Sequence, residues 1–282
     1  MDPTSKAILL AGGGPLGPEY IGTYRFTTPR VYDSYQWQVP ALTRYIFARA
    51  WGSGGEGQAY YLSGGSTMFC TIFGGIYCGT DGGAGGYSEA VIPVTPGETL
   101  LIGVGTVPNN SGNSVHNGAY AYGGGFTSVF RGSTPLIIAG GGGGAGQQNH
   151  AGNGGGTNPI AGNGSPSISG SYLTGGNPNG GGGYQGGNGD NNNGGSGGSG
   201  YVGATGNLYT TTATRTAGNL NPPNNSITDY VSGHGIGGTG SPFNNNYWGS
   251  GLLVIHALGG SYNPANTPST VIPASRTILA TY

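Results

Sequence analysis

The chain has 282 residues, of which 66 are glycine and only 6% are charged, and its formal net charge is −1. About 7% glycine and 25% charged residues are usual, so the composition excludes a highly charged disordered chain and a basic nucleic-acid-binding protein. No apolar run approaches the ~20 residues that span a bilayer, so we expect neither a nucleic-acid partner nor membrane insertion. The hydrophobic share of 34% predicts a compact core in only part of the chain.

The two ends of the chain differ from the middle. Residues 1–10 do not pair a charged region with a long apolar one, so we expect no signal peptide. We expect synthesis in the cytoplasm and, for a protein that ends in a virion or another extracellular assembly, release by lysis, which favours a virus or phage as source. We predict extended arms at residues 1–19 and 259–282; the second carries Pro264, Pro268 and Pro273.

Strand patterns occupy the first third of the chain. Residues 20–38 mix β-branched and aromatic residues with turn signals, which predicts short strands. Residues 44–51 alternate between a small-residue face and an aromatic face. The first face holds Ile46, Ala48 and Ala50, and the second holds Tyr45, Phe47, Arg49 and Trp51. Residues 87–94 and 99–104 predict two strands joined by a type II turn at Thr95-Pro96-Gly97-Glu98, with proline and glycine at its central positions.

Later strands complete the predicted sandwich. Residues 126–131 and 135–139 predict a hairpin, and residues 252–258 form the strongest late strand, which we expect to pair with the early strands. Residues 201–230, rich in Thr and Asn, are interpreted as a surface excursion. No segment shows helical periodicity, so we predict an all-β protein with little or no α-helix, whose β-sandwich spans residues 20–258.

Glycine dominates from Gly140 to about Gly200, in clusters that lack the strict Gly-X-Y repeat of collagen. One interpretation is a flexible linker. The other is a bundle of polyglycine-II helices, extended helices of the polyproline-II type that pack side by side because glycine has no Cβ. Ordering costs about 1–2 kcal/mol per residue, so a bundle requires a partner for nearly every backbone donor. On this interpretation the bundle is an insertion at about residues 140–250.

An apolar segment, residues 68–78, lies in the connection between Gly52 and Gly86. It either packs under the sandwich or forms an exposed tip, since large exposed apolar patches mark interfaces. The candidate interface or binding residues are Met68, Phe69, Ile72, Phe73, Ile76 and Tyr77. Cys70 and Cys78 flank a Gly-Gly turn and are either two buried thiols or a disulfide. Two cysteines with no nearby histidine do not predict a zinc site.

The sequence does not indicate an enzyme. Its nine Asp and Glu residues are dispersed, and we expect each of the four histidines to be exposed or satisfied by hydrogen bonds. Residues 186–190 match one copy of a calcium-binding repeat that acts only when stacked. The glycines after residues 135–139 open no helix, unlike a phosphate-binding loop. We therefore expect no catalytic residues, no cofactor and no metal.

Several motifs stand in an order that is typical of a known type of domain. They are Val39-Pro40-Ala41, Trp51-Gly52-Ser53-Gly54-Gly55, Gly82-Gly83-Ala84-Gly85-Gly86-Tyr87, Val94-Thr95-Pro96-Gly97-Glu98, Gly123-Gly124-Gly125-Phe126, Pro135-Leu136-Ile137-Ile138-Ala139-Gly140 and Gly251-Leu252-Leu253-Val254-Ile255. This order, over about residues 36–258, resembles the glycine-rich domains of phage tail-fibre and giant-virus surface proteins, and is similar to the glycine-rich domain of the anaplastic lymphoma kinase receptor family. The resemblance implies a jelly-roll-like sandwich that carries packed polyglycine helices. The segment from Cys70 to Cys78 and both arms depart from the pattern.

These observations lead to two hypotheses about function. The first is a structural subunit of a viral or virus-like extracellular assembly, a fibre, tube or shell. It self-associates through its arms and sandwich surface, so its partners are copies of itself in a homo-oligomer or filament. The alternative is a receptor-binding adhesin at a phage or viral fibre tip, with a host surface glycan or protein as partner. The Tyr-, Ser-, Gly- and Asn-rich loops have the composition of adaptable recognition surfaces.

Overall fold

The computed structural model describes residues 19–62, 76–106, 121–146, 149–158, 171–175, 179–189, 194–204, 206–215, 219–239, 248–263, 272–273 and 278–282. These residues form strands β1 to β12 and no helix, which confirms the prediction of an all-β protein. The same ranges accordingly contain no helix of the length and apolar character needed to cross a membrane.

Ten of the strands form two sheets. The first has the order β10 (Tyr209–Ala213), β6 (Tyr87–Pro93), β3 (Tyr45–Trp51), β11 (Leu252–Gly259), β1 (Glu19–Phe26) and β12 (Ile278–Thr281). The second has the order β2 (Arg30–Gln38), β7 (Thr99–Val104), β8 (Thr127–Arg131) and β9 (Thr134–Ala139). All pairings are antiparallel except that of β1 with β12. β4 (Gln58–Leu62) and β5 (Ile76–Thr80) form a separate hairpin.

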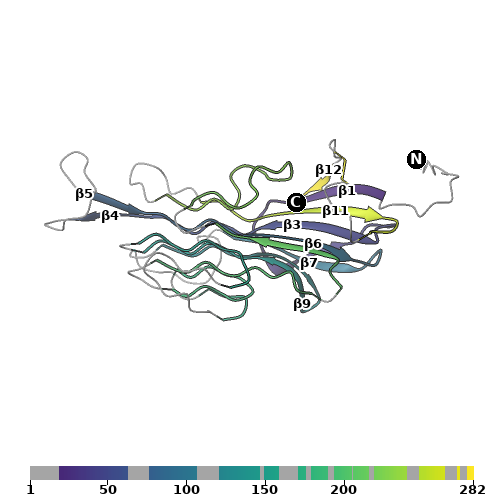
Figure 1. Ribbon diagram of the computed structural model, residues 1–282, viewed down its shortest axis with the longest axis horizontal. Helices are drawn as coiled ribbons and strands as arrows, with labels where there is room; N and C mark the ends of the chain where they lie inside the picture. The colour runs from purple at the N-terminus through teal and green to yellow at the C-terminus, as the bar shows by residue number, and fades with distance from the viewer. Residues whose placement is uncertain are drawn as a thin grey trace.

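The two sheets pack face to face in a sandwich-like arrangement (Figure 1). Side chains alternate along each strand, so one face of β3 enters the space between the sheets. That face carries Ile46, Ala48 and Ala50, which are fully buried in one apolar cluster with residues of the second sheet such as Ile102 and Ile137. The predicted division of residues 44–51 into two faces is confirmed.

The predicted connections within the sandwich are also found. β11 pairs with β3 and with β1, as expected for the late strand. Between β6 and β7, Gly97 has a φ of 82° and the Glu98 N–H donates to the Thr95 carbonyl at 3.0 Å, the geometry of a type II turn. The free side of β9 is covered by Tyr201, which exchanges two backbone hydrogen bonds with Ile138.

Residues 201–230 are not the surface excursion that their polarity predicted. Residues 209–213 form β10, which pairs with β6, and the Thr212 hydroxyl donates to the Tyr87 carbonyl at 3.1 Å. Residues 219–239 then cover the outer face of the six-stranded sheet, where the Pro223 carbonyl accepts the Trp51 indole N–H at 3.0 Å. The prediction failed because these polar side chains serve an edge strand and a buried hydrogen-bond network.

The glycine-rich segments are continuations of the sandwich strands. Segment 52–57 follows β3, segment 82–86 precedes β6, and segment 140–146 follows β9. They run side by side away from the sandwich (Figure 1). The Gly52 N–H donates to the Gly86 carbonyl at 3.0 Å, which extends the pairing of β3 with β6 beyond the last regular strand residue.

Segment 140–146 bonds to its neighbours with a period of three residues. The N–H groups of Gly141 and Gly144 both donate to segment 179–183, and those of Gly142 and Ala145 both donate to segment 52–57, at 2.7–2.9 Å. Its carbonyls follow the same rule: those of residues 140 and 143 accept from segment 82–86, and those of residues 141 and 144 accept from segment 194–200. The backbone polar groups of this buried segment are thereby paired in several directions around it.

Glycine is required where these segments touch. A Cβ added to Gly142 would lie 1.9 Å from the Gly83 carbonyl oxygen, and one added to Gly55 would lie 1.9 Å from the Gly143 carbonyl oxygen. Both neighbours are backbone atoms fixed by their own hydrogen bonds, so no side chain can rotate away to make room. The local richness in glycine therefore sets the distance between segments.

We predict that Gly142→Ala destabilises the fold by about 1–3 kcal/mol or more, the range of overpacked cores. Gly203→Ala is the matched control, because its added Cβ would meet only the Tyr201 ring, at 3.3 Å. Thermal unfolding followed by circular dichroism measures both variants. Equal melting temperatures for the two variants would contradict the close packing of the glycine segments.

Candidate functional sites

The predicted binding segment belongs to the β4–β5 hairpin. Ile76 and Tyr77 lie in β5, where their register partners in β4 are Leu62 and Tyr61. Met68, Phe69, Cys70, Ile72 and Phe73 lie outside the described residues. The two alternatives for Cys70 and Cys78, a disulfide or two thiols, therefore stay a prediction. The hairpin projects beyond the glycine segments, at the end of the molecule away from β12 (Figure 1).

The base of this hairpin is fixed on the glycine segments. Before β4, the Glu56 N–H donates to the Tyr122 carbonyl at 2.8 Å, and the Glu56 carboxylate accepts the Tyr122 N–H at 3.1 Å. After β5, the Thr80 hydroxyl donates to the Gly146 carbonyl, and the Asp81 N–H donates to Nδ1 of His150 at 2.9 Å. Both legs are held, so the hairpin extends from a rigid support. Burial raises the pKa of the Glu56 carboxyl, and the hydrogen bond from the Tyr122 N–H opposes this.

A second candidate is a buried ionic network on the outer face of the six-stranded sheet. Arg49 on β3 lies directly opposite Glu89 on β6, and its Nε donates to the Glu89 carboxylate at 3.1 Å. Its Nη1 donates to the Asp229 carboxylate, which comes from the covering segment 219–239. The Tyr87 and Tyr209 hydroxyls also donate to Glu89. Burial is the largest cause, and the Glu89 charge the second, of a strongly raised pKa of Tyr87.

His256 on β11 connects this network to β1. Its Nε2 lies 2.9 Å from the Asp229 carboxylate, and its Nδ1 lies 2.8 Å from the Thr23 hydroxyl. A carboxylate only accepts hydrogen bonds, so Nε2 carries a proton. In the neutral ring, Nδ1 then accepts the Thr23 hydroxyl proton. The Tyr20 hydroxyl lies 2.7 Å from Thr23 and extends the chain of hydrogen bonds.

The order hydroxyl, imidazole, carboxylate is that of a nucleophilic triad, but its surroundings favour a structural role. Thr23 is 1% exposed, and His256 and Asp229 are 0% exposed, so a substrate has no access to the Thr23 oxygen. Apolar clusters flank the network, one containing Trp51 and the other containing Phe47. The arrangement fixes segment 219–239 onto the sheet through charged hydrogen bonds in a buried environment.

Sequence reasoning placed Arg49 on the aromatic face but did not bring Glu89 and Asp229 together. The two carboxylates are 140 positions apart in the sequence, and both bind Arg49. One signal in the sequence could have indicated the Arg49–Glu89 pair. Arg49 is the only charged residue of β3 and Glu89 the only charged residue of β6, and their charges are opposite. Of the predicted satisfied histidines, His150, His234 and His256 all have hydrogen-bond partners, while His116 lies outside the described residues.

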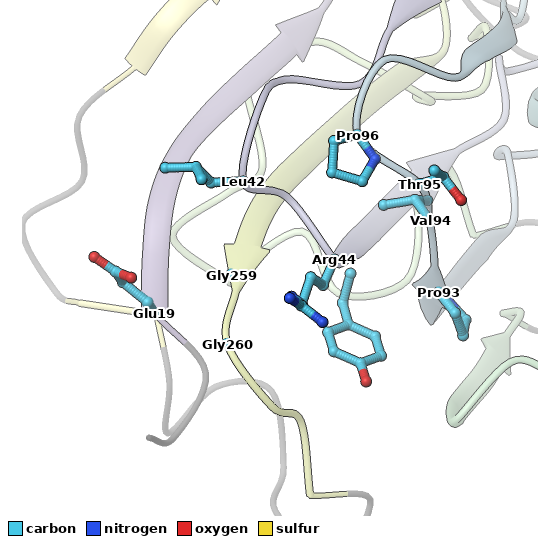
Figure 2. A pocket seen from close by; sticks show the side chains of 10 residues that line it. Glu19, Leu42, Arg44, Pro93, Val94, Thr95, Pro96, Gly259 and Gly260 are labelled. Atoms are coloured by element: carbon cyan, nitrogen blue, oxygen red, sulfur yellow. The ribbon is translucent and has the colours of Figure 1, made fainter. Parts of the chain in front are cut away.

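An open hollow of about 870 Å³ lies at the sandwich end, where β3 and β11 meet the loops beside them. Figure 2 shows Glu19 and Leu42 on one side and residues 93–96 on the other, with the Arg44 guanidinium between them. Leu42 is 79% exposed and has a φ of 69°, an uncommon conformation for a leucine. Within the described part of the chain the Arg44 guanidinium has no hydrogen-bond or ion-pair partner, so it is available to an anionic group.

The described residues contain no group of three or more His, Cys, Asp or Glu side chains arranged to hold a metal ion. Comparison with protein-family models and with curated proteins finds no match to this sequence.

We predict that Arg49→Leu lowers the free energy of unfolding by about 3–5 kcal/mol, because it leaves two buried carboxylates without their cation. Arg131→Leu is the control: Arg131 pairs with Glu98 at 3.0 Å but its side chain is 43% exposed, and such pairs contribute about 0–1 kcal/mol. Chemical denaturation measures both variants. A smaller loss in Arg49→Leu than in Arg131→Leu would show that the buried network does not hold the cover.

The raised pKa of Glu56 predicts a pH dependence. The carboxyl in the folded protein binds its proton more tightly than in the unfolded chain, so the stability linked to Glu56 is full below pH 4.5 and falls as pH rises through the raised value. Glu56→Gln removes this loss and keeps an oxygen for the Tyr122 N–H. We expect the variant to match the wild type in acid and to exceed its melting temperature at pH 7, whereas Glu19→Gln, at an exposed position, should match the wild-type melting temperature at both pH values.

Proposed function

We propose that this chain is a structural, non-enzymatic subunit of a viral or virus-like extracellular assembly, in which the glycine segments form a rigid spacer between the sandwich and the β4–β5 hairpin. The observation that carries the proposal is the backbone hydrogen bonding of segment 140–146, which returns to the same neighbour every third residue. Segments bonded in this way have few side chains for catalysis but resist bending, which suits a part that holds other surfaces apart.

In this proposal the glycine segments are packed polyglycine-II helices. Such helices have three residues per turn and no internal hydrogen bonds, so residues i and i+3 face the same neighbour and every N–H is free to bond outward. Segment 194–200 supports the same interpretation, because Gly195 and Gly198 both donate to segment 140–146 while Ser196 and Ser199 both donate to segment 185–188.

The proposal includes a jelly-roll-like sandwich. Supporting it, the chain passes between the sheets: β1 and β3 belong to the six-stranded sheet, whereas the intervening β2 belongs to the four-stranded sheet. The partners would be copies of the chain, joined through the arms at residues 1–19 and 259–282 and through the sandwich surface. The low content of charged residues, 6%, reduces repulsion between copies that pack closely.

A second candidate function is a receptor-binding adhesin at a phage or viral fibre tip. It is favoured by the position of the β4–β5 hairpin, which extends beyond the glycine segments and away from β12 (Figure 1). Its legs are fixed at Glu56 and Asp81, so a recognition loop on this hairpin would meet a host surface glycan or protein in a constant orientation.

We expect the purified chain to form filaments or large closed particles, visible by electron microscopy. Deletion of residues 1–18 should stop this assembly while the circular dichroism of the sandwich is retained, because the deletion removes an arm and none of strands β1 to β12. Light scattering gives the particle size of both proteins. Unchanged size after deletion would contradict assembly through this arm.

The adhesin candidate predicts a different result. A small closed oligomer or a monomer should then bind host cells, and replacement of residues 63–75 by a Gly-Ser linker should abolish binding without changing the oligomer. Replacement of a connection at the sandwich end, residues 132–133, is the control. Filaments that form spontaneously and bind no cells would decide for the structural subunit.

A further inference from the structure

The end of the segment predicted as an extended C-terminal arm forms β12, the outermost strand of the six-stranded sheet. It contacts the sheet through one neighbour, β1, with Thr23 opposite Ile278 and Arg25 opposite Thr281. Unlike every other pair in the two sheets, this pair is parallel. Parallel neighbours are not joined by a tight turn. The chain therefore reaches β12 through a long connection from β11, on the other side of β1.

The surface of β1 has features shaped for this strand. The Leu279 side chain occupies a notch over Gly22, where an added Cβ would lie 2.2 Å from Leu279 Cδ1. The Tyr282 ring stacks on Phe26, with centroids 4.9 Å apart, and lies 5.5 Å from the Tyr35 ring. We call this set, the Gly22 notch with Phe26 and Tyr35, the β12 socket.

Backbone hydrogen bonds complete the β12 socket. The Tyr282 N–H donates to the Arg25 carbonyl at 2.8 Å, and the Tyr282 carbonyl accepts the Thr27 and Thr28 N–H groups at 2.8 and 3.2 Å. All of these groups belong to β1 or the turn that follows it, apart from the Tyr35 ring on β2. These groups hold residues 278–282, while the connection that precedes them has its own contacts, with Tyr262 and Ile272 buried beside Phe47 and Leu258.

The connection between β11 and β12, residues 260–277, is longer than the distance between these two strands requires. β11 and β12 are separated by one strand, a distance of about 10 Å, whereas residues 260–277 span on the order of 60 Å when extended. This connection contains Pro264, Pro268 and Pro273, which disfavour pairing into the sheet.

We propose that β12 is exchanged between copies together with Ile272: Ile272 of one chain packs in the Phe47 cluster of the next, and residues 278–282 fill the β12 socket of that chain. This inference rests on the proposed structural function and names its contact. Ile272, which is buried beside Phe47 and Leu258, moves with the strand into the same cluster of the next chain. Exchange then reproduces every interaction of the docked segment and changes only the path of the chain between Tyr262 and Ile272, and such swapping is a low-cost route to assembly. A strand given to one neighbour and a socket filled by another generate a chain of subunits or a closed ring.

Two cysteine variants test the proposal in the full-length protein, in a background where Cys70 and Cys78 are replaced by serine. One chain carries Arg25→Cys and the other Thr281→Cys, at positions that face each other in the β1–β12 register. Mixed under oxidising conditions, they should form a covalent heterodimer of twice the 28.0 kDa chain mass. Arg131→Cys mixed with Thr281→Cys, at positions in different sheets, is the control and should form at least tenfold less.

Notch variants test the specificity of this contact. Gly22→Ala on the Arg25→Cys chain should reduce the yield of heterodimer several-fold, and Leu279→Ala on the Thr281→Cys chain should restore it by removing the clashing atoms. Leu279→Ala on one chain is expected to restore the yield that Gly22→Ala on the other chain removes. Such a rescue between chains cannot occur if the yield was lost through misfolding of the Gly22→Ala chain.

The results separate this proposal from the proposed function. A third chain carries both Arg25→Cys and Thr281→Cys. If its disulfide forms only within the chain, and light scattering still shows particles of wild-type size, strand exchange is overturned and the structural function stands. A wild-type protein that remains monomeric and forms no heterodimer would overturn both. Heterodimer formation with suppression at the notch would establish the exchange.

Discussion

The close approach of glycine backbones is the constraint on which the rest of the structure depends. Each ordered residue costs about 1–2 kcal/mol of backbone entropy, and one hydrogen bond returns a net of about 0.5–1.5 kcal/mol, so an isolated glycine segment would not stay ordered. Gly143 donates to Gly152 and accepts from Gly83, and its neighbours do the same in other directions. The free energy of ordering becomes favourable because the glycine segments continue strands of the sandwich. The sandwich fixes the direction of these strands, so part of the entropy cost has already been met.

The sandwich meets this demand with a small core and a second layer of interactions on its outer face. Between the sheets, alternating side chains of β3 and β11 form an ordinary apolar core. On the outer face, Arg49, Glu89, Asp229 and His256 hold segment 219–239 in place. Buried charges of this kind are costly to desolvate, and when satisfied they specify one arrangement. The cover therefore has a fixed position, and its own glycine residues 235–238 bond from there to segments 52–57 and 82–86.

Local patterns predicted the sandwich, whereas contacts between distant residues escaped them. The alternation in residues 44–51 and the Pro-Gly pair at residues 96–97 determine a strand and a turn by local physics, and both were found. Asp229 looked like an ordinary surface residue because its partner Arg49 lies 180 positions away. The sequence predicts an arm where β12 forms, because a short strand with three prolines upstream has no local signature. Its docking depends on the absence of a side chain at Gly22.

The distribution of glycine also determines where recognition can occur. In the packed segments the space that a side chain would occupy already holds a neighbouring carbonyl, as at Gly142 and Gly55, so these residues offer partners little beyond backbone. Surface side chains lie where this packing ends, among them those of the β4–β5 hairpin at one end and of the edge of the six-stranded sheet at the other. In the proposed assembly, a change of partner at the hairpin leaves the exchanged β12 contact undisturbed, because the glycine segments between them contribute no specificity of their own.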